Sequence, residues 1–121
     1  MTGSVEIVAR YALALPEAEP GQHFDIPDFR VRGKIFCTAR TGEPLAMVKL
    51  PQALQEAVTT LHPGAITPAA GAWGRRGSTL VRTDLVPEPL LADLIVSAWR
   101  NVAPAKLVAA YLAENESASS V

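Results

Sequence analysis

Residues 15–38 read LPEAEPGQHFDIPDFRVRGKIFCT and carry the strongest indication of fold in the chain. Within this stretch, apolar and basic side chains alternate from Phe29 to Arg32. Such alternation is typical of a strand with one buried and one exposed face. Gly33 permits a tight turn into a second strand at 34–40. The stretch therefore predicts an antiparallel hairpin with one apolar face and one basic face.

The flanking sequence predicts helices before and after this hairpin. Apolar residues at helical spacing and well-placed prolines predict helices at 5–14, 51–61, 87–100 and 104–114, the first with Ser4 as its N-cap. Further strands are expected at 22–26, 45–50 and 73–83, with a turn at Pro27-Asp28 and a loop at 62–72. This order, α-β-β-β-β-α-β-α-α, predicts an α+β fold with an antiparallel sheet of about five strands and helices packed on one face.

Length and composition indicate a single globular domain. The chain has 121 residues, of which 49% are hydrophobic and 19% charged, and we expect a domain at 1–116 and a disordered tail at 117–121. One cysteine excludes an intramolecular disulfide. No apolar run reaches the roughly 18 residues of a membrane span, and the start lacks a signal-peptide pattern. We therefore expect a cytoplasmic protein with no membrane partner.

Charge is distributed unevenly along the chain. Residues 1–29 contain five acidic side chains and one basic side chain, whereas residues 30–82 contain eight basic and two acidic side chains. Cations near flexible glycines can neutralise phosphates and give sequence-independent affinity for nucleic acid. The candidate nucleic-acid contacts are Arg30, Arg32, Lys34, Arg75, Arg76 and Arg82. The alternative is a solvated strand face whose cations pair with nearby acids, and the isoelectric point near 6.1 is lower than that of a dedicated nucleic-acid binder.

Other chemical motifs in the chain are weak. Cys37 lies in a strand pattern, where burial is expected rather than nucleophilic reactivity. His23 with nearby acids matches no established metal motif, and neither a metal nor another cofactor is predicted. The glycines at 71, 74 and 77 precede a strand, so they favour turns over a phosphate loop, and the last two helices favour packing over a DNA-reading helix-turn-helix.

The ordered set of motifs resembles the MmcQ/YjbR family. The matching stretches are LPEAE at 15–19, FRVRGKIF at 29–36, VKLP at 48–51, the proline-glycine loop up to Trp73, and SAWRNVAPAKL at 97–107. The resemblance covers nearly the whole domain and implies a "double wing" DNA-binding-like fold, related in shape to frataxin and CyaY. The family commonly has two lysines after the late Ala-Pro, whereas here Ala105 replaces the first.

Two non-enzymatic interpretations lead at the level of the sequence, and the third alternative is a hydrolytic or metal enzyme that would need Cys37 or a histidine to converge with acids in one pocket. The first is a module that contacts DNA weakly and without sequence preference through the basic hairpin and the Gly-Arg-Arg-Gly loop as two wings. The second is a protein-interaction or small-ligand module that uses the open face of the sheet. That second interpretation predicts an apolar or mixed patch around Phe36, Met47 and Trp73.

Overall fold

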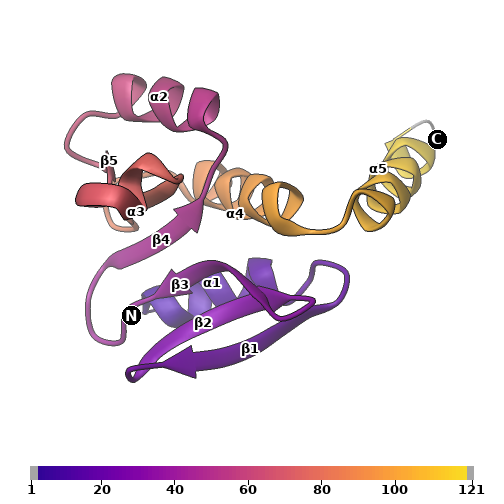
Figure 1. Cartoon of the computed structure of the whole chain (residues 1–121), viewed down its shortest axis with the longest axis horizontal. Coiled ribbons are helices and arrows are strands. Elements are labelled where there is room, and N and C mark those ends of the chain that lie inside the picture. The colour runs from indigo at the N-terminus through magenta and orange to yellow at the C-terminus, as the bar shows by residue number, and fades with distance from the viewer. Residues whose placement is uncertain (1–2, 120–121) are drawn as a thin grey trace.

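A six-stranded antiparallel sheet forms the centre of the molecule in the computed structural model, which describes residues 3–119 (Figure 1). The strands lie in the order β1-β2-β3-β4-β6-β5. Their bounds are β1 Ala18–His23, β2 Ile26–Val31, β3 Lys34–Ala39, β4 Leu45–Lys49, β5 Ile66–Pro68 and β6 Ser78–Arg82. The first four strands are neighbours in both sequence and space. The α+β class and the helices on one face are confirmed.

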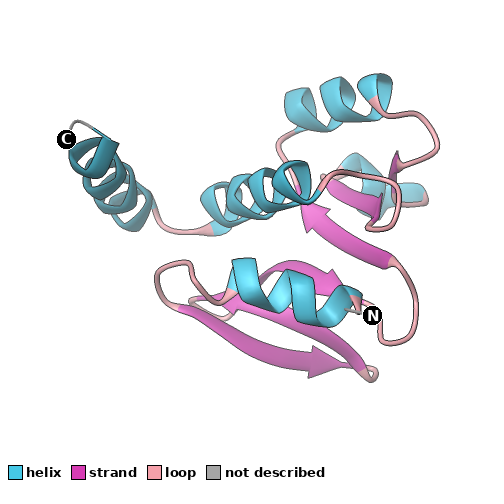
Figure 2. Cartoon of the chain, turned by 180° about the vertical axis from the view of Figure 1, so that it is seen from behind, coloured by secondary structure: helices cyan, strands magenta, loops and turns pink. Residues whose placement is uncertain are grey.

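Two helices cover one face of this sheet and leave the other face open. The helices are α1 Ser4–Ala12, α2 Gln52–Leu61, α3 Gly71–Arg75, α4 Glu88–Val102 and α5 Ala105–Ser119. Helices α1 and α4 pack against each other and against β3 and β4 (Figure 2). Helix α2 packs beside β5, and the short α3 packs beside β6. Helix α5 lies at one end of the molecule (Figure 1). Its Tyr111 makes an edge-to-face contact with Trp99 of α4.

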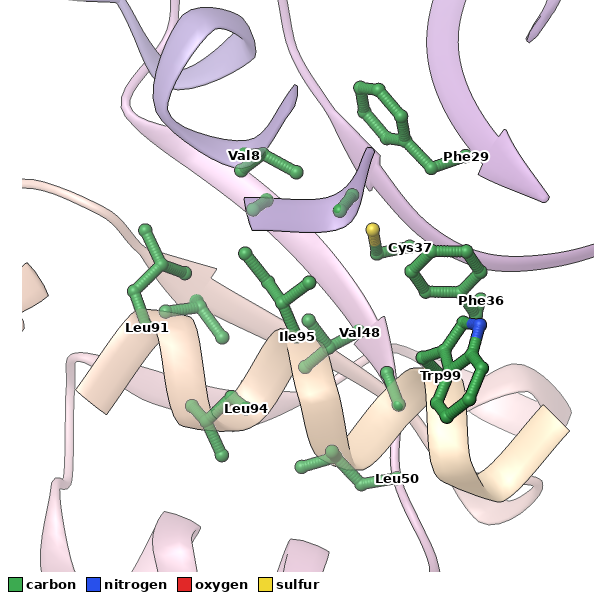
Figure 3. Packing of buried hydrophobic residues seen from close by; sticks show 14 of the residues in the cluster. Val8, Phe29, Phe36, Cys37, Val48, Leu50, Leu91, Leu94, Ile95 and Trp99 are labelled. Carbon is green, nitrogen blue, oxygen red and sulfur yellow. The ribbon is translucent and has the colours of Figure 1, made fainter. Parts of the chain in front are cut away.

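The core lies between the sheet and the helix pair (Figure 3). Side chains of Val8, Ile95 and Trp99 from the helices meet Phe29 and Val48 from the sheet, and all five are almost completely buried. The Trp99 indole donates a hydrogen bond to the carbonyl oxygen of Pro16 at 3.0 Å. Aliphatic residues therefore build most of this core, as the low aromatic content of the chain requires.

A bulge in β3 turns two successive side chains toward this core. Phe29 pairs with Cys37, but Arg30 pairs with Ile35, so Phe36 is the extra residue. Phe36 is fully buried together with Cys37. The expectation that Phe36 contributes to an exposed patch is therefore wrong, because strict alternation does not continue through a bulge.

Both hairpins of the first three strands close with two-residue turns. The turn between β2 and β3 places Arg32 and Gly33 at positive φ, as a type I′ turn requires. Arg32 therefore lies in the turn rather than on the strand face beside Arg30. The turn between β1 and β2 is formed by Phe24 and Asp25, also at positive φ. The turn expected at Pro27-Asp28 is wrong, since both residues lie inside β2.

Other element boundaries also differ from the sequence expectations. The sheet has six strands rather than about five, because β5 forms in the expected loop at 62–72. The strand expected at 73–83 begins only at Ser78, after helix α3. Gly3 is the N-cap of α1, and Ser4 instead hydrogen-bonds the carbonyl of Glu43 and the hydroxyl of Thr83. The tail expected at 117–121 overlaps α5, which runs to Ser119, and residues 120–121 lie outside the described part.

Candidate functional site

The open face of the sheet carries a row of cross-strand neighbours. Thr38 pairs with Met47, and Met47 pairs with Leu80, so these three side chains lie side by side across β3, β4 and β6. Their strand neighbours point into the core on the other side, as the alternation of a strand requires. Helices α1 and α4 lie on the opposite face of the sheet and do not cover this row. The row therefore forms the floor of a surface that a ligand can reach.

A cavity of about 630 Å³ lies over this floor. Its volume is in the range of small-molecule sites. The lining residues are His23, Ile26, Ile35, Thr38, Arg40, Leu45, Ala46, Met47, Lys49, Ala69, Ala70, Trp73, Ser78 and Leu80. Most of them are apolar, three are cationic or can become so, and none is acidic. We call this the open-face cavity.

Trp73 forms one wall of the open-face cavity and is 66% exposed. Helix α3 is held in place by Gln55 of α2, whose amide donates to the Gly74 carbonyl at 2.9 Å and to the Thr79 hydroxyl at 3.0 Å. A Cβ atom at Gly74 would lie only 1.9 Å from the Ala69 oxygen, so glycine allows α3 to pack directly on the preceding segment. The indole is therefore presented to solvent by a well-anchored helix.

A buried carboxylate organises the other end of the cavity. Asp28 is fully buried and accepts hydrogen bonds from Arg30 at 2.8 and 3.0 Å. Its Oδ2 atom also lies 2.9 Å from Nδ1 of His23. Gly21 lies opposite Asp28 on β1, and a Cβ atom there would approach Asp28 Oδ1 to 2.7 Å. The glycine therefore provides the space in which this network lies on the sheet.

The network favours the charged form of Asp28 and orients the side chains around it. The Arg30 guanidinium, together with His23, lowers the pKa of Asp28 although burial of the carboxyl group opposes this change. Because Nδ1 of His23 bonds the carboxylate, the ring is held with its other nitrogen available to a ligand. His23 lines the cavity, so this end offers an oriented imidazole.

Three of the six predicted nucleic-acid contacts are in ion pairs. Arg30 pairs with Asp28 as described, Arg32 pairs with Glu17 at 2.5 and 3.0 Å, and Arg82 pairs with Asp84 at 2.9 Å. The guanidinium groups in turn lower the pKa of Glu17 and of Asp84. The alternative of strand cations paired with nearby acids therefore describes these three residues.

The other three predicted contacts are exposed cations. Lys34, Arg75 and Arg76 have no carboxylate partner within the part of the chain that the structure describes. Arg75 ends α3 and Arg76 follows it, whereas Lys34 begins β3. Lys34 and Arg30 line a second hollow with Lys49, so the structure brings these two predicted residues together.

The structure also bears on the other features considered in the sequence, which are Cys37, a metal site and a membrane span. Cys37 is buried as expected, and burial together with the charge of Asp28 raises its pKa, which disfavours the thiolate. Among residues 3–115, whose side chains the structure describes, no group of three His, Cys, Asp or Glu side chains is arranged to hold a metal ion. No described helix is long and apolar enough to cross a bilayer.

Lys49 and Arg40, which line the open-face cavity, were not among the predicted site residues. Leu45, Met47 and Lys49 alternate with core residues along β4, and this period of two was the available signal. Only the register of β4 between β3 and β6 shows that Lys49 reaches the same region as Lys34. Trp73 is expected in an apolar or mixed patch on the open face, and it is the exposed aromatic wall of the cavity.

Comparison with known proteins identifies the family. A family model described as YjbR matches residues 13–101, which is most of the chain. The crystal structure of Deinococcus radiodurans protein DR2400, which has the family-model domain DUF419, superposes with a TM-score of 0.71 at 19% sequence identity. The match covers 80% of this chain and 76% of that one and shows a shared fold. No curated protein matches the chain. The extent of the family match, together with the α+β architecture, places this chain in the YjbR family.

Proposed function

We propose that this chain is a non-enzymatic binding module and that its open-face cavity holds a small ligand with an apolar body and an anionic group. One observation carries this proposal: the cavity combines an apolar floor with a cationic rim and has no acidic lining residue. Burial of Cys37, the single cysteine of the chain, is consistent with binding rather than with thiol-based covalent catalysis. The concave shape favours a small molecule over a flat protein surface.

The apolar part of the cavity provides most of the available binding energy. Trp73 is exposed over two-thirds of its surface, and Met47 and Leu80 are only partly buried. Covering the exposed part of such an indole removes about 100–150 Å² from water, which corresponds to about 3 kcal/mol. A flat, apolar ligand that stacks on this wall gains that energy without displacing a protein side chain.

The rim selects the charge of the ligand. Lys49 has no carboxylate partner in the described residues, and Arg40 has only an exposed contact of 3.7 Å with Glu43. Thr38 lines the cavity, and its hydroxyl has no side-chain hydrogen bond within the described chain. Cations in a partly apolar setting attract an anion more strongly than they do in bulk water. The ligand is therefore expected to carry at least one negative charge.

The proposal is tested with the amphipathic anion 1-anilinonaphthalene-8-sulfonate. We expect saturable binding to the folded protein, with a blue-shifted emission and one site per chain. Trp73→Ala should weaken this binding by roughly tenfold or more, because the stacking energy on the indole is removed. Leu85→Ala is the matched control, because Leu85 is 56% exposed but does not line the cavity. Equal affinity of the two variants would refute the assignment of the site.

A second candidate function is contact with nucleic acid, which the three unpaired cations support. The triple variant Lys34→Ala, Arg75→Ala, Arg76→Ala should reduce the salt dependence of duplex binding by about 0.9 in log–log slope for each phosphate that the protein no longer neutralises. The double variant Arg32→Ala, Arg82→Ala is the control, because both side chains are already paired with acids. If the wild-type protein shows no salt-dependent binding to duplex DNA, this candidate is discarded.

A further inference from the structure

A second hollow adjoins the open-face cavity and is basic. It has a volume of about 450 Å³ and lies where the start of β3 and the end of β4 meet the last turn of α4. The lining residues are Arg30, Gly33, Lys34, Ile35, Lys49, Asn101 and Val102. Three of these seven residues are cations, and none is acidic. We call this the basic hollow.

The charge of the basic hollow remains positive after its neighbours are counted. Asp28 offsets the charge of Arg30, with which it is bonded through Nε and Nη2. Lys34 and Lys49 have no carboxylate partner in the part of the chain that is described. The carboxyl end of α4 contributes about half a negative charge nearby. The two ammonium groups outweigh this partial charge, so an anion is attracted to the hollow.

Hydrogen bonds fix the geometry of this site. Because Nε and Nη2 of Arg30 donate hydrogen bonds to Asp28, the guanidinium is held in one orientation, and its Nη1 can donate to a ligand. Asn101 of α4 donates to the carbonyl oxygen of Lys49 at 3.1 Å, which ties the end of the helix to the end of β4. The donors of the hollow therefore come from a hairpin, a strand end and a helix end that are linked to one another.

The basic hollow and the open-face cavity are adjacent. Ile35 and Lys49 line both of them, so a single molecule can place one part in each. The cavity offers an aromatic wall and an apolar floor, whereas the hollow offers several hydrogen-bond donors and positive charge. Lysine and arginine donors of this kind suit the several oxygens of a phosphate group.

We propose that the basic hollow binds the phosphate group of a phosphate monoester whose flat, apolar or heterocyclic body lies in the open-face cavity. This inference rests on the proposed ligand-binding function and deepens it by naming the ligand class. A free nucleoside monophosphate has this chemistry. Its base stacks on Trp73, and its phosphate meets Lys34, Lys49 and the remaining edge of Arg30.

Three probes separate the two halves of the site in titration calorimetry: adenosine, inorganic phosphate and adenosine 5′-monophosphate. We expect the monophosphate to bind roughly 10- to 100-fold more tightly than adenosine, because charge-assisted hydrogen bonds to phosphate add to the same stacking. Inorganic phosphate alone should bind only weakly. A monophosphate that binds no more tightly than adenosine would overturn the inference.

Charge-removing variants locate the phosphate. Lys34→Met and Lys49→Met should each reduce the affinity for the monophosphate by about tenfold. Lys34 does not line the open-face cavity, so Lys34→Met should leave the affinity for adenosine nearly unchanged. Lys106→Met is the control, since Lys106 is an exposed lysine of α5 that lines neither hollow nor cavity. A reduction of monophosphate affinity that is equal in all three variants would contradict the assignment, because it would reflect only net charge.

The same titrations distinguish failure of this inference from failure of the proposed function. If anilinonaphthalene sulfonate binds at Trp73 but phosphate adds no affinity, the cavity is retained and the phosphate site is rejected. If no apolar anion binds at all, both are rejected. A single-stranded oligonucleotide whose affinity rises with its length and exceeds that of the monophosphate would reassign the surface to nucleic acid and overturn the small-ligand form of the inference.

Discussion

Replacing Asp28 by asparagine tests whether the buried network holds the candidate site together. Three hydrogen bonds end on this carboxylate, two from Arg30 and one from His23. Hydrogen bonds to a charged group contribute about 1.5–3 kcal/mol when buried, and less where the partner is exposed. Here Arg30 and His23 are each more than one-third exposed, and an amide retains one acceptor oxygen. We therefore expect Asp28→Asn to lower the free energy of unfolding by about 2–3 kcal/mol.

The pH dependence of this destabilisation identifies its cause. Arg30 and His23 lower the pKa of Asp28 in the folded protein, so its stabilisation is fully present above the carboxyl pKa of the unfolded chain, about 4. The stabilisation disappears as the pH falls through the lower folded pKa. Thermal or urea unfolding at pH 7 should show the full difference between wild type and Asp28→Asn, equivalent to roughly 6–15 °C in Tm. The difference should decrease as the pH falls below about 4 and should reach zero only below the lowered pKa of the folded carboxyl group.

Asp84→Asn is the matched control for this experiment. Asp84 has the same two-residue spacing from its arginine and the same two-pronged geometry, but both partners are exposed. Exposed ion pairs of this kind contribute little, so no resolvable change in Tm is expected. A decrease as large in Asp84→Asn as in Asp28→Asn, or a difference that persists unchanged at pH 3, would refute the reasoning.

Three further predictions concern the scaffold. Gly77→Ala should lower the urea midpoint by an amount equivalent to more than about 2 kcal/mol of unfolding free energy. The reason is that Gly77 has a φ of 106° and that a Cβ atom there would lie 2.3 Å from the Leu50 carbonyl oxygen. An unchanged midpoint would contradict this prediction. The Cys37 thiol should react with a thiol reagent at pH 8 only as fast as the protein unfolds, and immediately in denaturant; rapid labelling of folded protein would disprove its burial. Ser4→Ala should lower the free energy of unfolding by about 1 kcal/mol, because the Ser4 hydroxyl hydrogen-bonds the carbonyl of Glu43 and the hydroxyl of Thr83. Equal stability would show that these hydrogen bonds are dispensable.

The sequence was sufficient for the elements with strong periodicity. The alternation around Phe29 and the apolar stripe of α4 each identified an element and its buried face. It was insufficient for β1, where Pro20 and Gly21 suggested a loop. Proline is tolerated there because β1 is the edge strand, and the glycine makes room for Asp28 and Arg30. Both reasons depend on pairing partners that composition does not reveal.

The candidate site was harder to predict than the fold. The six predicted nucleic-acid contacts could be selected because they are lysine or arginine. Whether each is available to a ligand depends on which acidic side chain the fold places next to it. Arg32 lies beside Glu17, fifteen residues away in the sequence, and this contact requires the pairing of β1 with β2. Lys49 went unnoticed because its role follows from strand register, which a pattern along one strand does not specify.

The order of the strands has a consequence for how the molecule assembles. Strands β1 to β4 pair with their sequence neighbours through short connections, whereas the pairing of β4 with β6 must close the segment 50–77. Long loop closure is slower and entropically more costly than hairpin formation. The open-face cavity lies across the pairing of β4 with β6, with Met47 on β4 and Leu80 on β6. A ligand seated there therefore recognises only fully folded chains, and by mass action it protects them against unfolding.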